Sequence, residues 1–177
     1  MEIRRYLPDV DRWASVELAY DDWKKVRLQL PKGTPIEIPR SACQVDTSQG
    51  PFPDFISFGL SAPILSERAW QVLEKLSPSL EPHTVDVPSA DRPYFILRIP
   101  TVPLLDEEAA KIRHRLAGDV FVDRYAFKPI PADTPAIFYV PEMRFKDILV
   151  TEEFIDCVNE HKLTGLIFPK LRMADDQ

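Results

Sequence analysis

This chain is rich in proline and poor in glycine: 18 of its 177 residues are proline and only 5 are glycine. A typical chain of this length holds about 9 prolines and about 12 glycines. Proline fixes φ and has no N–H group to donate to a β-ladder, so it interrupts strands and stiffens the connections between them. Because most of these prolines fall between short apolar runs, we expect short strands joined by rigid turns.

Short apolar runs of strand-like composition cover much of the sequence. They are Ile3–Leu7, Ile36–Ile38, Phe55–Phe58, Thr84–Val87, Tyr94–Val102, Val120–Phe127, Ala136–Val140, Ile148–Val150 and Leu166–Phe168. These runs do not alternate regularly with helical segments, which disfavours a doubly wound α/β fold. The pattern predicts an α+β fold, in which two or three helices pack on a mixed, largely antiparallel sheet.

Two segments carry the signals of a helix start. In the first, Ser66 is a natural N-cap, Leu65 and Trp70 occupy the positions of a hydrophobic staple, and Pro78 ends the helix. Its apolar stripe consists of Ala69, Trp70, Leu73 and Leu76. In the second segment we expect Thr151 to cap, with Glu152 and Glu153 favouring the positive end of the helix dipole.

Two further segments are less clear. A weaker helical pattern runs from Asp106 as N-cap to Gly118 as C-cap, with Glu107 facing Lys111. The stretch Asp9–Leu30 is ambiguous. Helical spacing is approximated by Trp13, Val16, Tyr20 and Trp23, whereas strand-like alternation is shown by Val26, Leu28 and Leu30.

Length and composition place the chain among ordinary globular proteins. With 45% hydrophobic and 28% charged residues, residues 1–177 are expected to form a single domain. No apolar run approaches the ~20 residues of a membrane span, and early charges such as Arg4 and Arg5 disfavour a secretory signal. The two cysteines, Cys43 and Cys157, form neither a disulfide framework nor a zinc spacing, so we expect a reduced, cytoplasmic location.

The formal net charge is −6. Nucleic-acid binding depends on lysine and arginine displacing counterions from phosphates, so this charge argues against DNA or RNA as a partner. An acidic surface instead speeds the encounter with a basic protein. The alternative is that the charge only keeps the protein soluble.

Residues with catalytic or metal-binding chemistry are scattered. Cys43 lies near Asp46, and His83, His114 or His161 could approach it only through the fold. Cys157 shares a helix face with apolar residues and is expected to pack in the core, with His161 in a structural role at the last turn. The sequence has no metal-ligand spacing and no glycine-rich phosphate loop, so we expect no cofactor and no metal.

One segment has the composition of a protein-binding surface, because large aromatics and acids interleave in it. Its candidate partner-binding residues are Asp9, Asp11, Trp13, Tyr20, Asp21, Asp22 and Trp23. The alternative is that Trp13 and Trp23 are core residues beside a charged edge.

Several segments together resemble one family. They are Gly33–Ile36, Pro53–Phe55, Leu65–Leu73, Tyr94–Ile99, Leu105–Asp106, Ile137–Phe138, Ile148–Phe154 and Leu163–Phe168. The most specific is formed by the last two together, in which the capped helix that begins in Ile148–Phe154 runs on to a Leu-Thr-Gly turn and a short strand in Leu163–Phe168. In these motifs the chain resembles the Imm11 family of bacterial immunity proteins, which are found beside polymorphic toxins.

The resemblance implies a protein that neutralises a cognate toxin by binding it directly, with no catalytic residues of its own. Its motif residues are caps, stripe positions and a turn glycine, so they mark the fold and not the toxin-binding surface. A basic nuclease would complement the acidic chain. Two alternatives remain open at this point: an enzyme assembled from Cys43, His83 and His114, and a non-enzymatic adaptor.

Overall fold

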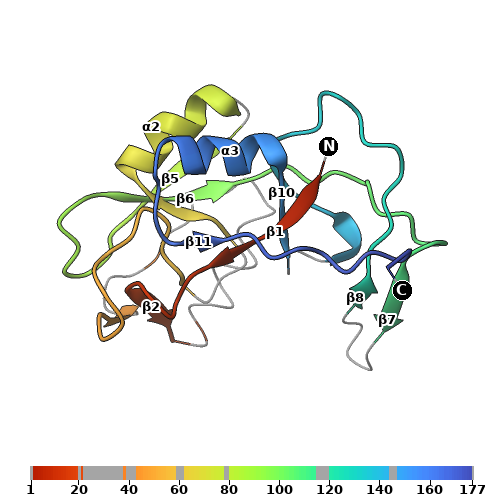
Figure 1. The fold of residues 1–177 in the computed structure, drawn as a ribbon. Coiled ribbons are helices and arrows are strands. Elements are labelled where there is room, and N and C mark those ends of the chain that lie inside the picture. Colours follow the sequence, from red (N-terminus) through yellow and green to blue (C-terminus); the bar gives the residue numbers. More distant parts are fainter. Residues whose placement is uncertain are drawn as a thin grey trace.

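Short antiparallel strands build most of the structure, a computed structural model that describes residues 2–19, 21, 38, 43–58, 62–77, 80–114, 120–143 and 147–176. Within these ranges the chain forms eleven strands and two α-helices (Figure 1). All strands paired within the sheets run antiparallel. The predicted α+β class is confirmed, but the strands form four small sheets where the sequence indicated one.

The elements have the following bounds. The strands are β1 (Ile3–Pro8), β2 (Ser15–Leu18), β3 (Cys43–Asp46), β4 (Ile64–Ser66), β5 (Glu81–Val85), β6 (Tyr94–Arg98), β7 (Lys111–His114), β8 (Val120–Arg124), β9 (Ile137–Tyr139), β10 (Ile148–Thr151) and β11 (Leu166–Ile167). The helices are α2 (Glu67–Leu76), α3 (Glu152–Glu160) and the 3-10 turn η3 (Pro141–Met143). The sheet orders are β11-β1-β10-β9, β4-β6-β5, β2-β3 and β7-β8. Among the described residues, no helix has the length and hydropathy of a membrane span.

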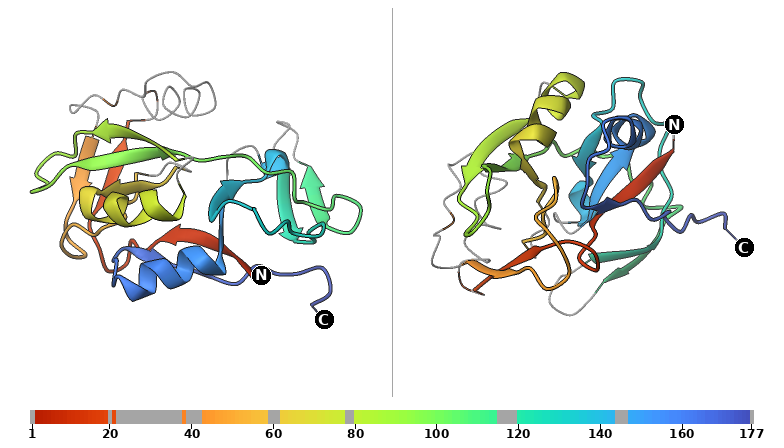
Figure 2. Two further views of the ribbon diagram at one scale, coloured as in Figure 1. Left: turned by 90° about the horizontal axis from the view of Figure 1, so that it is seen from above. Right: turned by 60° about the vertical axis from the view of Figure 1, so that its left-hand side comes forward.

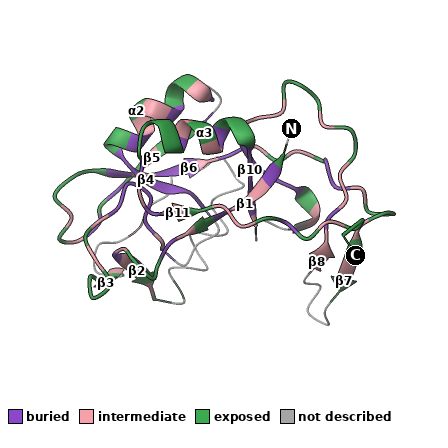
Figure 3. Cartoon of the chain, viewed as in Figure 1, coloured by how far each residue is buried: buried purple, intermediate pink, exposed green. Residues whose placement is uncertain are grey.

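The two larger sheets separate three apolar clusters, so their inner strands bury side chains on both faces (Figure 3). In β10, Val150 belongs to the central cluster and Leu149 to the cluster on the β7–β8 side. In β6, Leu97 belongs to the central cluster and Ile96 to the cluster that includes Val16 of β2. Strands that are buried on both faces have continuous apolar sequences, which explains why these segments could be predicted as strands from the sequence.

The central cluster lies between these sheets and is covered by both helices. Tyr6, Phe55 and Phe154 meet there, with ring centroids 6.1 to 6.3 Å apart. Such tilted or edge-on aromatic contacts add to the free energy of burial. Ala69 and Leu73 of α2 belong to the cluster, and Figure 2 shows that α2 and α3 lie side by side.

The two predicted helix starts are both at the expected residue, but only one is capped as expected. Ser66 accepts a hydrogen bond from the Ala69 amide at 3.2 Å, as the sequence predicted. Thr151 occupies the N-cap position of α3, yet its side chain makes no cap hydrogen bond. The reason is that Thr151 is also the last residue of β10, paired with Ile3, and its side chain is buried. The prediction of a side-chain cap at Thr151 is therefore wrong.

The third predicted helix is also wrong. Asp106 does start a helical turn, because its carboxylate accepts from the amides of Glu108 and Ala109, both at 3.2 Å. The chain then changes to β7, which pairs with β8. Ile112 packs against the apolar cluster on that side, so burial through strand pairing outweighs the short helical periodicity. Gly118 lies outside the described residues.

Other predicted boundaries shift where proline decides them. The predicted strand Tyr94–Val102 ends at Arg98, before Pro100. The predicted strand Thr84–Val87 corresponds to β5, which begins earlier, at Glu81, and ends at Val85. It can include Pro82 because β5 lies at the edge of its sheet, where a strand tolerates proline. The predicted strand Phe55–Phe58 forms only isolated β-bridges, at Phe55 and at Ser57, and does not extend into a regular strand.

The ambiguous N-terminal stretch contains a strand. Val16 lies in β2 and is paired with β3, so the helical spacing of Trp13 with Val16 does not correspond to a helix. Tyr20, Trp23 and the alternating residues Val26, Leu28 and Leu30 lie outside the described residues, as does all but the last residue of the predicted strand Ile36–Ile38.

A buried carboxylate links three separate segments of the fold. Asp54, whose side chain is 3% exposed, accepts from the Ser66 hydroxyl (2.9 Å) and the Arg68 guanidinium (2.8 Å). It also accepts from the amide and the hydroxyl of Thr164, at 3.0 and 3.1 Å. Asp54 therefore fixes the start of α2 and the turn after α3 to the same point.

The turn after α3 is closed by its own backbone. The amide of Leu163 donates to the carbonyl of Val158 (2.9 Å), and the amide of Lys162 donates to that of Asn159 (3.1 Å). This is the Schellman arrangement, in which the residue after the C-cap adopts a left-handed conformation, here Lys162 with φ of 51°. Leu163 and Val158 are both buried in the central cluster.

Gly165 completes the turn, and a side chain has no room there. Its φ is +98°, and a Cβ atom would overlap the Phe55 carbonyl oxygen and lie 2.6 Å from Cβ of Pro53. The Leu-Thr-Gly turn thus needs glycine both for its backbone conformation and for the close approach of the segment 53–55.

We expect Gly165→Ala to lower the free energy of unfolding by about 2–4 kcal/mol, because the methyl group overlaps backbone and the residue must stay left-handed. A urea titration followed by tryptophan fluorescence measures this change. The matched control is Lys162→Gly in the same turn, which should leave stability unchanged or raise it by up to about 1 kcal/mol. A Gly165→Ala protein as stable as the wild type would contradict the close packing of this turn.

Candidate partner-binding surface

The residues of the enzyme alternative are distributed over three sheets. Cys43 lies on β3, His83 on β5 and His114 on β7, and both Figures 1 and 2 place β7 at the opposite end of the molecule from β2, the partner of β3. Cys43 and His114 are therefore not brought together. His83 is half-buried, and its Nε2 atom has no hydrogen-bond partner in the described structure.

Cys157 lies on α3 and His161 at its C-cap, as expected, but Cys157 is half-buried against the central cluster and not in the core. The His161 ring Nδ1 is 2.9 Å from the Cys157 carbonyl oxygen, and the His161 carbonyl accepts from the Arg68 guanidinium at 2.7 Å. The first contact lies within the last turn of α3, and the second ties the end of α3 to α2. Within the ranges that the structure describes, no group of three histidine, cysteine or carboxylate side chains has the geometry of a metal site.

The candidate partner-binding residues predicted from the sequence are only partly described. Asp9 is buried, and its carboxylate is bound to the Arg12 guanidinium at 2.6 Å. Asp11 and Asp21 are exposed, and Trp13 is half-buried. The other three residues of this set, Tyr20, Asp22 and Trp23, lie outside the described residues. Asp9 therefore offers no free charge, and the partner-binding role of this set stays a prediction.

Exposed apolar side chains occur close to that set in the chain. The large hydrophobic residues that are exposed in the described part of the structure are Leu7, Val10 and Ile167. Leu7 and Ile167 are cross-strand partners in β1 and β11. We call Leu7, Val10, Asp11 and Ile167 the N-terminal surface.

Helix α3 carries an unusual concentration of negative charge. Four of its nine residues are acidic, none is basic, and all four acids are exposed. They are Glu152, Glu153, Asp156 and Glu160. None of them forms an ion pair with any residue that the structure describes. The sequence of α3 contains no lysine or arginine that could balance these negative charges.

Only part of this charge pattern favours the helix, because Glu152 and Glu153 lie in its first turn, at the positive end of the dipole. Asp156 lies one turn from both Glu152 and Glu160, and like charges at this spacing destabilise a helix by about 0.2–0.5 kcal/mol per pair. Glu160 also lies at the negative end of the helix dipole, where an acid is unfavourable by about 0.3–1 kcal/mol. The folded structure thus accounts for the acids of the first turn, but it gives no account of why Asp156 and Glu160 are acidic.

The acidic side of α3 borders a groove between α3 and α2. One cavity of about 560 Å³ is lined by Leu76, Thr151, Glu152, Glu153, Asp156, Cys157 and Glu160. A second cavity of about 450 Å³ is lined by Arg68, Gln71, Val72, Lys75, Leu76, Cys157 and His161. Because Leu76 and Cys157 line both cavities, we treat the two as one feature, the α2–α3 groove.

Two polar groups at the α2–α3 groove are affected by this environment. Thr151 is 1% exposed, and its hydroxyl has no hydrogen-bond partner among the described residues, although buried hydroxyls are normally paired. Burial raises the pKa of the Cys157 thiol above its ordinary value, and the carboxylates of Glu160 and Glu153 raise it further. Burial is the larger cause of this rise in the pKa of Cys157, and the two carboxylates add to it.

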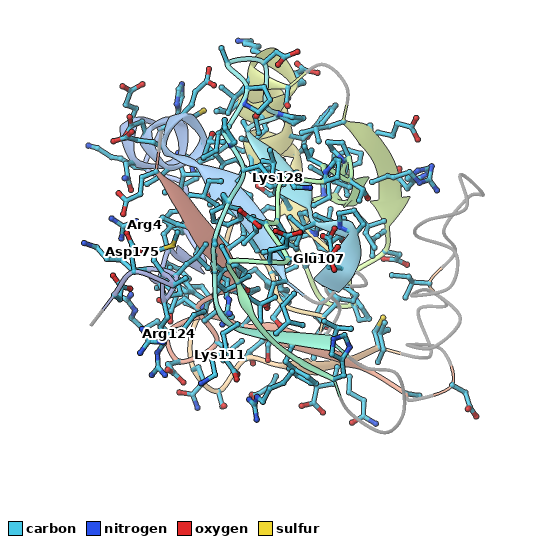
Figure 4. All side chains as sticks on the ribbon, turned by 90° about the vertical axis from the view of Figure 1, so that its right-hand side faces the viewer. Arg4, Glu107, Lys111, Arg124, Lys128 and Asp175 are labelled. Carbon is cyan, nitrogen blue, oxygen red and sulfur yellow. The ribbon has the colours of Figure 1, made fainter. Side chains whose placement is uncertain are left out.

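A third surface has mixed charge. A cavity of about 680 Å³ near the C-terminal segment is lined by Lys128 and Lys170 together with Glu2 and Asp176. Figure 4 shows the charged side chains of this side spread over the face. Some are already engaged, such as Glu2 with Arg4 at 3.0 Å. This face therefore does not favour ligands of one sign of charge over the other.

The sequence analysis missed the α2–α3 groove. It treated Glu152 and Glu153 as dipole partners and Cys157 as a core residue, although four acids without a base in nine residues were visible in the printed sequence. The contribution of α2 could not be seen, because Leu76 and Cys157 lie 81 positions apart.

Comparison of the chain with models of known protein families and with curated proteins finds no match. The resemblance to bacterial immunity proteins therefore rests on the sequence motifs alone.

We expect Glu160→Lys to raise the free energy of unfolding by about 0.5–1 kcal/mol, because it places a cation at the helix C-terminus and opposite Asp156. Thermal or urea denaturation at low ionic strength measures the gain. Glu152→Lys is the matched control with the same change in net charge. It should change stability by less than about 0.5 kcal/mol, since its unfavourable dipole interaction offsets its attraction to Asp156. Equal gains in both variants would point to net charge as the cause.

We expect the double variant Glu153→Gln/Glu160→Gln to make Cys157 react faster with iodoacetamide at pH 8. Removing the two carboxylates lowers the raised pKa of the thiol, so a larger fraction is thiolate at that pH. Mass spectrometry of the labelled peptides gives the rate, with Cys43 in the same sample as the reference. An unchanged ratio of the two rates would show that the carboxylates do not act on Cys157.

Proposed function

We propose that this chain is an immunity protein that binds a cognate bacterial toxin and neutralises it by covering its active site or substrate channel. The observation that carries the proposal is the uncompensated acidic face of α3, with four exposed carboxylates beside a groove. Such a face is suited to a basic protein, since complementary charge accelerates association and selects the partner. The resemblance of the sequence motifs to immunity proteins supports the same function.

A nuclease is the toxin class that fits this charge best. An enzyme that acts on nucleic acid surrounds its substrate phosphates with lysine and arginine. A protein with a net charge of −6 and a concentrated acidic face can occupy the same surface in place of the nucleic acid. Inhibition of this kind needs tight binding and no turnover, so we propose a non-catalytic role in the cytoplasm, with no cofactor.

The adaptor alternative differs from this proposal in its partner and not in its chemistry. An immunity gene lies beside the gene of its toxin, whereas an adaptor gene has no such neighbour. The product of the adjacent gene is therefore the first partner to test.

We expect this protein to co-purify with the product of the adjacent gene and to abolish its toxic activity at a molar ratio near one. The adjacent protein should be produced with and without this chain, and its activity assayed on DNA and RNA. Binding should weaken when ionic strength rises from about 0.05 to 0.5 M, because surface charges are screened over shorter distances. Full toxin activity in the presence of excess protein would rule out the proposed function.

A variant with Cys43→Ser and His114→Ala separates this proposal from the enzyme alternative. If the protein acts by binding alone, the variant should neutralise the toxin as the wild type does. Loss of neutralisation with retained folding and toxin binding would favour the enzyme.

A further inference from the structure

We infer that the toxin docks in the α2–α3 groove through a segment rich in lysine or arginine, whose cationic ends lie over α3. This inference rests on the proposed function and adds the surface and the chemistry of the contact. It is carried by three features of the groove: carboxylates on one rim that form no ion pair with a described residue, an apolar floor, and a buried hydroxyl without a hydrogen-bond partner in the described part of the chain.

The acidic rim consists of Glu152, Glu153, Asp156 and Glu160. Because these carboxylates make no ion pair with described residues, an incoming cation does not have to displace an internal one. A single exposed ion pair contributes little. Four carboxylates along one helix face attract several cations at once, which favours a basic segment over an isolated charge.

The floor suits the long stems of lysine and arginine. Leu76 and Cys157 are half-buried and line both halves of the groove. The methylene stem of a lysine or arginine can pack on such an apolar floor while its charged end reaches the carboxylate rim. Aspartate or glutamate side chains are too short and of the wrong charge to do the same.

The unpartnered hydroxyl of Thr151 points to the same ligand. Thr151 lines the acidic half of the groove, and its Oγ1 atom is buried without a hydrogen bond. A hydroxyl can accept a hydrogen bond as well as donate one, and lysine and arginine carry only donors. A cationic side chain that gains access to this atom would therefore satisfy a group that no described residue pairs with.

The opposite half of the groove sets the orientation of the segment. It is lined by the cations Arg68 and Lys75 and by His161. Arg68 is already bound to Asp54 and to the His161 carbonyl. Because this rim repels further positive charge, the cations of the segment lie over α3 and its neutral or acidic residues lie over α2.

The other two surfaces carry weaker arguments. On the mixed-charge face, Glu2 is already paired with Arg4, and the cavity there has charges of both signs. The N-terminal surface has one exposed acid, Asp11, beside exposed apolar residues. It is the rival surface, and it supplies a matched control.

The test compares charge reversals in and outside the α2–α3 groove, with the product of the adjacent gene as the ligand. Asp156→Lys/Glu160→Lys should weaken toxin binding by at least about tenfold in calorimetry, because two attractive contacts become repulsive. Asp11→Lys/Asp21→Lys makes the same change in net charge at the predicted N-terminal residues and should weaken binding by less than about threefold. Each variant is first checked for folding by thermal denaturation.

A second measurement maps the contact without any substitution. Bound toxin should protect Cys157 from alkylation by iodoacetamide and leave Cys43, on β3, as reactive as in the free protein. Thr151→Val should preserve folding, since it removes an unpaired hydroxyl, and should weaken toxin binding by a factor of about three to ten if that hydroxyl accepts from the toxin.

The outcomes separate the two levels of the proposal. If the wild type binds the toxin and the Asp156→Lys/Glu160→Lys variant binds equally well with Cys157 unprotected, the docking inference is overturned and the proposed function stands. A selective loss in Asp11→Lys/Asp21→Lys would transfer the contact to the N-terminal residues predicted from the sequence. If the wild type does not bind the toxin, the proposed function fails and the inference fails with it.

Discussion

The buried carboxylate of Asp54 is the interaction on which the arrangement of the helices depends. It accepts from residues 12, 14 and 110 positions away, at Ser66, Arg68 and Thr164. A buried carboxylate is stable only when such donors surround it, so the start of α2 and the turn after α3 cannot move apart without leaving it unpaired. The same contacts place α2 beside α3 and so create the groove between them.

The inner faces of the two helices stabilise the fold, and their outer faces are left free for another role. Phe154 and Val158 of α3, like Ala69 and Leu73 of α2, are buried in the central cluster. Burial of such side chains contributes about 1.5–3 kcal/mol each for the larger ones, which exceeds the few tenths of a kcal/mol lost to each repulsive acid pair on the outside. The fold can therefore tolerate an outer face selected for binding.

Local signals in the sequence predicted local structure, and failed where distant residues decide. Ser66 and the apolar runs of β1 and β10 were predictable, because a helix cap and a buried strand are determined by residues that are neighbours in the sequence. Asp106 also gave a correct local signal, a single turn, but the pairing of β7 with β8 then overrode the helical pattern. Asp54 carries no local signal at all, since its partners come from two distant segments. For the same reason the acids of α3 could be read from the sequence, whereas the groove that they border could not.

The C-terminus of α3 explains how so acidic a helix remains stable. Helices often place lysine or arginine in the last turn to balance the dipole and the unpaired carbonyls. Here the carbonyls of Val158 and Asn159 are instead satisfied by backbone amides of the Schellman turn, and the Leu163 side chain anchors that turn in the central cluster. Since the backbone closes the helix, no basic side chain is needed inside it. The helix can then present carboxylates along its whole exposed length, which is the property that a surface for a basic protein requires.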